Sequence, residues 1–194
     1  MIYNKNKGFT LIELLVVMAI FAVVSATVMA NYKTFGHKTL LKNLAYSIAL
    51  TVREAQVSGL TGRNFTSDSD SEYYSSYGVF FTQANPKQYI FFRDLQSIGN
   101  EHKYDNGAQE LVRTYSILGG RRITRLCTYS SVGGNCNNAS ELHVTFKRPQ
   151  PDAYIYTDGA GPFARADIEI TSPEGEKIYV IVEAAGQISV SKTP

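Results

Sequence analysis

Hydrophobic residues are concentrated at the N-terminal end of this 194-residue chain. Residues 9–30 read FTLIELLVVMAIFAVVSATVMA and contain a single charged residue, Glu13. As an α-helix this run extends about 33 Å, which is enough to cross the hydrocarbon core of a bilayer. The pattern therefore predicts a transmembrane helix over residues 9–30.

A helical period continues beyond this run. Apolar residues recur at steps of three and four, at Leu41, Leu44, Ala45, Ile48, Val52 and Ala55. One apolar stripe on an otherwise polar helix is typical of a helix packed on a soluble domain. We expect an amphipathic helix over residues 31–58, with Gly59 and Gly62 as stop signals.

Residues 59–194 have the pattern of a β-rich domain. A polar segment, residues 59–77, is followed by short β-type runs separated by turn residues. We predict strands at 78–82, 88–93, 111–117, 122–128, 142–147, 166–171 and 177–183, and a last strand around Ile188 and Val190. The last three form an antiparallel meander with period-two burial. The fold class is therefore α+β, and the absence of βαβ alternation excludes a doubly wound fold.

Charge around the apolar run sets an expected orientation. Lys5 and Lys7 precede it, so the N-terminus should face the cytoplasm and the β-rich domain should lie outside. A removed secretory signal is the alternative, and Ser25, Ala26 and Ala30 keep it open. The run is longer than the 7–15 apolar residues typical of such a signal. We therefore expect the helix to stay on the protein.

Glu13 needs a partner because a carboxylate at the bilayer centre costs about 2.5–3.5 kcal/mol on insertion scales. A free α-amine, created by cutting the chain just before the apolar run, would be a suitable one.

The stretch from Gly8 to Val17, GFTLIELLVV, resembles the type III signal of type IV pilins and type II secretion pseudopilins. The resemblance implies a leader of residues 1–8, cleavage between Gly8 and Phe9 by a prepilin peptidase, and N-methylation of Phe9. It also implies that other subunits, an inner-membrane assembly platform and the bilayer are partners. In the filament that the resemblance implies, the amine of one subunit's Phe9 could meet Glu13 of its neighbour, and such a pair would fix the stagger of the subunits.

A weaker resemblance covers most of the chain and is to the H-type minor pseudopilins and related minor pilins. It rests on residues 52–55 (VREA), 77–79 (YGV) and 92–94 (FRD), and on the closing meander. It implies a pilin fold, in which the long helix packs on an antiparallel β-sandwich-like domain. It also implies a structural subunit near a filament tip, and it leaves pilus and secretion pseudopilus undistinguished.

No pattern in the chain indicates catalysis. His102 and His143 lack a motif that would place them beside a nucleophile or metal ligand, so we expect no enzyme, cofactor or metal site. Asp68, Asp70 and Glu72 alternate with serines but lack the spacing of an EF-hand, and we interpret them as a solvated loop.

A formal net charge of +2 rules out a chain-wide nucleic-acid footprint but leaves room for a local one. Arg121, Arg122 and Arg125 could bind DNA phosphates if they share a face. The alternative function is therefore a DNA-binding minor pilin for DNA uptake. Residues 186–189 read GQIS, so the Gly-Arg-x-Arg motif that some DNA-uptake minor pilins carry in their last β-region is missing.

Two cysteines, Cys127 and Cys136, flank a short loop. A domain outside the cytoplasm permits a disulfide there, and no metal-ligand cluster surrounds the pair in the sequence. We favour the bridge over two free thiols.

Overall fold

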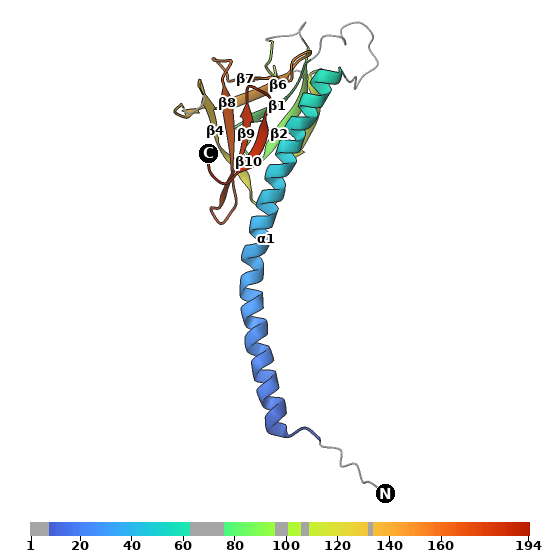
Figure 1. The fold of residues 1–194 in the computed structure, drawn as a ribbon, viewed down its shortest axis with the longest axis vertical. Coiled ribbons are helices and arrows are strands. Elements are labelled where there is room, and N and C mark those ends of the chain that lie inside the picture. Colours follow the sequence, from blue (N-terminus) through green and yellow to red (C-terminus); the bar gives the residue numbers. More distant parts are fainter. Residues whose placement is uncertain (1–7, 63–75, 96–100, 106–108, 132–133) are drawn as a thin grey trace. The chain divides into compact units, whose positions relative to one another are not determined.

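The computed structural model describes residues 8–62, 76–95, 101–105, 109–131 and 134–194, and of residues 30–35 and 37 it describes the backbone alone. The chain divides into two compact units, Met1–Thr39 and Leu40–Pro194. One long helix, α1 (Leu11–Thr61), contributes residues to both units (Figure 1).

The first unit contains the apolar half of α1. Residues Leu11–Met29 are long and apolar enough to cross a membrane, and none of them is buried inside the structure. Large side chains on every side of this segment are exposed, from Leu11 to Met29. A soluble protein rarely exposes so much contiguous apolar surface. The predicted apolar N-terminal helix is confirmed.

The second unit contains two antiparallel five-stranded sheets (Figure 1). The first has the order β3-β2-β1-β6-β7, with β1 (Ser76–Thr82), β2 (Gln88–Asp94), β3 (Leu111–Ser116), β6 (Glu141–Phe146) and β7 (Ala153–Tyr156). The second has the order β10-β9-β8-β4-β5, with β4 (Arg122–Tyr129), β5 (Asn137–Asn138), β8 (Arg165–Thr171), β9 (Lys177–Glu183) and β10 (Ile188–Ser191). The α+β fold class and the closing meander β8-β9-β10 are confirmed.

One hydrophobic core joins α1 to both sheets. The helix contributes the predicted stripe, Leu41, Ala45, Ile48, Val52 and Ala55, and all five residues are buried. Alternate residues of the strands face this core, among them Val79 and Phe81 of β1 and Ile168 and Ile170 of β8. Alternation at period two thus turns one face of each sheet towards this core. The predicted period-two burial is wrong for β8 and β9, because their opposite face is buried too. This packing is consistent with a pilin fold.

Gly59 does not end the helix, because α1 continues past residue 58 to Thr61. Gly62 follows with φ +61°, a conformation that glycine adopts without strain. Gly59 instead allows close packing of α1 on β6. A Cβ added there would lie 2.3 Å from the carbonyl oxygen of Phe146.

Candidate functional site

The predicted cleavage point lies in an accessible segment. Gly8, Phe9 and Thr10 are exposed and precede the first helical residue, Leu11. The Phe9 side chain is 83% exposed. Lys5 and Lys7, predicted to orient the chain, lie outside the described residues. Gly8 and Phe9 both lie before the first helical residue, so the backbone on either side of the predicted cut is outside α1.

Glu13 and Thr10 cap the N-terminus of α1. The backbone N–H of Glu13 donates to Thr10 Oγ1 (3.3 Å), and the backbone N–H of Thr10 donates to Glu13 Oε2 (3.5 Å). This is a capping box, which satisfies two backbone donors that the first turn of a helix leaves without partners. Our sequence reasoning missed this role, although the T-x-x-E spacing of Thr10 and Glu13 is its usual signal.

A β-bulge brings two of the predicted arginines onto one face of the second sheet. Arg122 pairs with Thr171 and Arg125 with Glu169, and the register shifts between Ile123 and Arg125. Without that shift, residues three apart would point to opposite faces. Arg121 lies just before β4, in the turn that leads into the strand.

Arg125 is already engaged by a carboxylate. Its Nη2 lies 3.5 Å from Oε2 of Glu169, and Nζ of Lys177 lies 3.0 Å from Oε1. Glu169 is only 4% exposed and also accepts a hydrogen bond from Thr124 (2.8 Å). Burial raises the pKa of Glu169, but hydrogen bonds from Lys177 and Thr124 outweigh burial and leave the pKa lowered. Glu169 therefore stays charged and neutralises part of this basic face.

The predicted bridge between Cys127 and Cys136 is present. It ties the buried strand β4 to the segment before β5, and the two residues are nine apart in the sequence.

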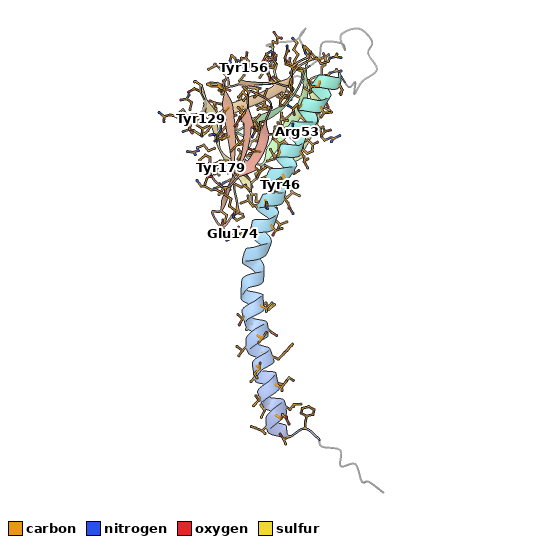
Figure 2. All side chains as sticks on the ribbon, viewed as in Figure 1. Tyr46, Arg53, Tyr129, Tyr156, Glu174 and Tyr179 are labelled. Atoms are coloured by element: carbon orange, nitrogen blue, oxygen red, sulfur yellow. A yellow bond between two sulfur atoms is a disulfide. The ribbon has the colours of Figure 1, made fainter. Side chains whose placement is uncertain are left out.

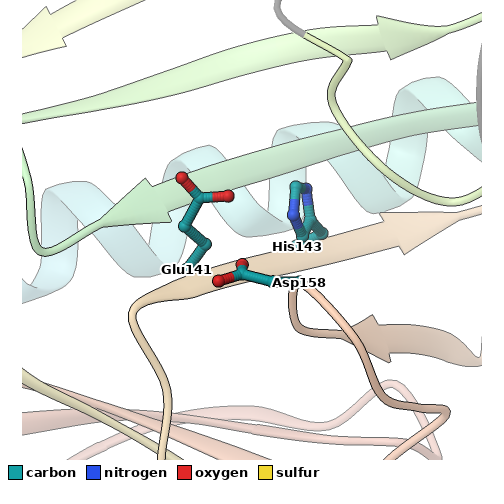
Figure 3. A group of neighbouring side chains, drawn as sticks. All are labelled: Glu141, His143 and Asp158. Atoms are coloured by element: carbon teal, nitrogen blue, oxygen red, sulfur yellow. The ribbon is translucent and has the colours of Figure 1, made fainter.

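Glu141, His143 and Asp158 form a cluster that sequence reasoning did not find (Figure 3). One ligand atom from each lies within 4.8 Å of the others. Glu141 and His143 alternate on β6, and Asp158 follows β7, so strand pairing brings them together. The E-x-H spacing was the only signal in the sequence.

The hydrogen bonding of His143 argues against a metal ion at this cluster. Its Nδ1 accepts the backbone N–H of Tyr104 (3.0 Å). Burial lowers the pKa of His143 to about 4, so the ring is neutral and its single proton lies on Nε2. A metal ion needs a ring nitrogen with a free lone pair, and a metal-bound histidine usually donates a hydrogen bond from its other ring nitrogen. In His143, Nδ1 accepts a hydrogen bond and Nε2 carries the proton, so neither nitrogen is in the state that a ligand needs. Asp68, Asp70 and Glu72 lie outside the described residues.

Residues 3–29 match the family model of the prokaryotic N-terminal methylation motif. No curated protein and no solved structure matched the chain. The motif is that of a structural subunit type, not of an enzyme family. The match covers the cleavage point, the capping box and the apolar part of α1. Together with that exposed apolar helix, it identifies a chain that fits the type IV pilins and pseudopilins.

Proposed function

We propose that the chain is a minor pilin or pseudopilin, a structural subunit that assembles through its N-terminal helix once the leader has been removed. The observation that carries this proposal is the methylation motif on a helix whose apolar side chains, Leu11–Met29, are all exposed. Such a helix is stable in lipid and, after extraction, in a bundle of similar helices. Prepilin peptidase would cut between Gly8 and Phe9.

The proposed location is the bacterial inner membrane, followed by a pilus or secretion pseudopilus near its tip. The chain would cross the membrane once, with the N-terminus in the cytoplasm and the β-rich domain in the periplasm. The disulfide supports this orientation, because disulfides form in the periplasm and are rare in the cytosol. The partners are the bilayer, prepilin peptidase, an inner-membrane assembly platform and other subunits.

A second helix face supports assembly through α1. Within the second unit, Tyr46, Leu50, Arg53 and Val57 recur at steps of four and three on the side away from the core stripe. Leu50 is 69% exposed, and Figure 2 labels Tyr46 and Arg53 on this part of the helix. An apolar strip that no part of the described domain covers suits a neighbouring subunit.

Mass spectrometry of protein from cells with an active prepilin peptidase tests the processing step. The mature chain should begin at an N-methylated Phe9. Gly8→Val should block cleavage and leave Met1 in place, and Gly36→Ala is the matched control that should be processed normally. An intact Met1 on the natural protein would contradict the proposal.

Two variants separate the charge of Glu13 from its capping role. Glu13→Gln keeps a capping-box side chain but removes the charge, whereas Thr10→Val removes the cap and keeps the charge. We expect both to insert into the membrane and only Glu13→Gln to lose incorporation into filaments. Normal incorporation of Glu13→Gln would refute the charge pair, and failure of Thr10→Val alone would assign the effect to the cap.

DNA binding is the second candidate function. The register places Arg122 and Lys177 in one row across Thr171, next to Arg125. These three cations outnumber Glu169, the carboxylate that Arg125 and Lys177 share. DNA binding by the full chain in detergent should then weaken steeply with salt and be lost in an Arg122→Gln/Lys177→Gln variant. Arg113→Gln, on the other sheet, is the control, and absence of binding at low salt would exclude this function.

A further inference from the structure

The outer face of the first sheet carries a second aromatic layer. Val79 and Phe81 point into the core, so Phe80 between them points to the opposite face, as does Phe92 on β2. A Cβ on Gly78 would lie 2.8 Å from the ring of Phe92, so glycine leaves the space that this ring fills. Phe80 and Phe92 are nevertheless buried, which means that another segment covers them.

That segment is residues 101–105, here called the strap. The Tyr104 ring lies 5.3 Å from the ring of Phe80 and 5.4 Å from that of Phe92. The His102 ring stacks on Tyr154 of β7, with ring centroids 4.0 Å apart and planes only 4° from parallel. The strap thus shields the aromatic layer from solvent.

Side chains, not strand pairing, hold the backbone of the strap. The N–H of His102 donates to Asp94 Oδ2 (2.8 Å), and the N–H of Asp105 donates to Glu110 Oε2 (2.9 Å). Between them, the N–H of Tyr104 donates to Nδ1 of His143 on β6 (3.0 Å). An imidazole accepts this bond only while it is neutral.

We propose that the strap is an acid-released cover, and that His143 on the sheet and His102 in the strap form its latch. Protonation of His143 would place a hydrogen on Nδ1, facing the N–H of Tyr104, and the hydrogen bond between these two groups would break. His102 is 8% exposed, and its Nε2 lies 3.6 Å from Oε1 of Glu101. Its buried Nδ1 has no hydrogen-bond partner among the described residues, so a charged ring would leave one N–H unpaired there. Release would expose an aromatic surface on the first sheet.

Charged groups around the two imidazole rings do not reverse the preference of both rings for the neutral form in the closed strap. His143 faces the charged or titratable groups of Lys103, Tyr104, Asp105, Glu141 and Asp158. His102 faces Asp94, Glu101 and Lys147. Burial is the largest influence in both cases and lowers both pKa values, that of His143 to about 4.

The carboxyl groups at the strap act in the opposite direction. Burial raises the pKa of Asp94 and of Glu110, so both take up protons more readily while the strap is closed. Acid therefore favours the closed strap through the carboxyl groups and the open strap through the imidazoles. Opening of the strap on acidification is therefore expected from protonation of the two histidines and not from protonation of Asp94 or Glu110.

Hydrogen exchange at the Tyr104 amide, corrected for the intrinsic effect of pH, measures the opening of the strap. In the full chain in detergent, we expect its protection to fall about 20-fold between pH 7 and pH 5 from His143 alone. This follows because a pKa of about 4 in the closed strap returns to about 6.5 in the open one. His102 adds to the change in the same direction.

Asparagine variants test the latch. His143→Asn keeps an acceptor near Nδ1 without a titrating ring, and His102→Asn tolerates the positive φ of 67° at that position. Each single variant should reduce the pH dependence of the protection of the Tyr104 amide, and the double variant should abolish it. His37→Asn, in the other unit, should behave like the natural protein.

Three results would overturn the proposal. The first is unchanged protection of Tyr104 at pH 5. The second is a Tyr104 amide that is protected as strongly as the amides of Ile168 and Val180 in the second sheet at both pH values, which would mean that it exchanges only through global unfolding. The third is a double variant that keeps the full pH dependence.

Discussion

Gly59→Ala tests the closest contact between α1 and the first sheet. The added Cβ would lie 2.3 Å from the carbonyl oxygen and 2.8 Å from the carbonyl carbon of Phe146, whereas real Cβ contacts stay above 3.0 Å. Phe146 is fully buried on β6, a strand paired on both sides, so its backbone has little room to yield. Overpacking of this kind lowers the free energy of unfolding by about 1–3 kcal/mol. The higher helix propensity of alanine compared with glycine raises it by about 1 kcal/mol.

With a contact this short, the cost lies at the upper end of that range, and we expect a net loss of about 2 kcal/mol. For a domain of this size the loss lowers the Tm by about 4–8 °C. The near-UV circular dichroism of the tyrosines, followed during heating, reports the packing of the β-rich domain. Gly36→Ala is the matched control, because a Cβ there meets nothing within 4 Å, so it adds helix propensity without overpacking and should not lower the Tm. A Gly59→Ala variant as stable as that control would refute the close packing.

Three further predictions concern the β-rich domain. Arg165→Ala should lower the free energy of unfolding by about 3–5 kcal/mol in urea titrations, because it removes the ion pair of the buried carboxylate of Asp167. Among the described residues, Tyr129 would remain as its hydrogen-bond partner, and a loss below 1 kcal/mol would contradict the prediction. Replacing both cysteines of the disulfide with serine should cost about 2–3 kcal/mol by the same measurement, and an unchanged urea midpoint would argue against the bridge. The natural domain should lose about 3 kcal/mol as the pH falls from about 6.5 to about 4, because the unfolded state binds a proton that buried His143 does not; an equal loss in His143→Asn would show that other groups are responsible.

The parts of the fold that follow from local pattern were predicted from the sequence. Exposed apolar residues around the whole of Leu11–Met29 required only composition and length. The closing meander required only alternation, since Ile178, Val180 and Val182 face the core, whereas Tyr179 and Ile181 between them lie on the opposite face of the strand. Period and composition are properties of a single segment, so no tertiary information was needed.

Features that depend on distant residues were not predicted. Strand β7 (Ala153–Tyr156) is short and follows two prolines, so pairing with β6 defines it more than its own sequence does. The role of Gly59 depends on Phe146, and the engagement of Arg125 depends on Glu169 and on a bulge. These contacts exist only after the sheets and the helix have packed.

The candidate site divides in the same way. Gly8, Phe9 and Glu13 stand in one contiguous stretch, and the sequence was sufficient to single them out. The capping box was also readable, because Thr10 and Glu13 are three residues apart. The strap was not, because the acceptor of the Tyr104 N–H comes from His143 on a strand that lies 39 residues further along the chain.

The reciprocal hydrogen bonds between Thr10 and Glu13 give the carboxylate of a single subunit a partner within its own helix. Both residues follow the proposed cut, so trimming the leader leaves this arrangement intact. In the proposed filament, the amine of an incoming subunit would compete with the first turn of the helix for the same carboxylate. Incorporation would then exchange one partner of Glu13 for another, and the carboxylate would have a hydrogen-bond donor both before and after assembly.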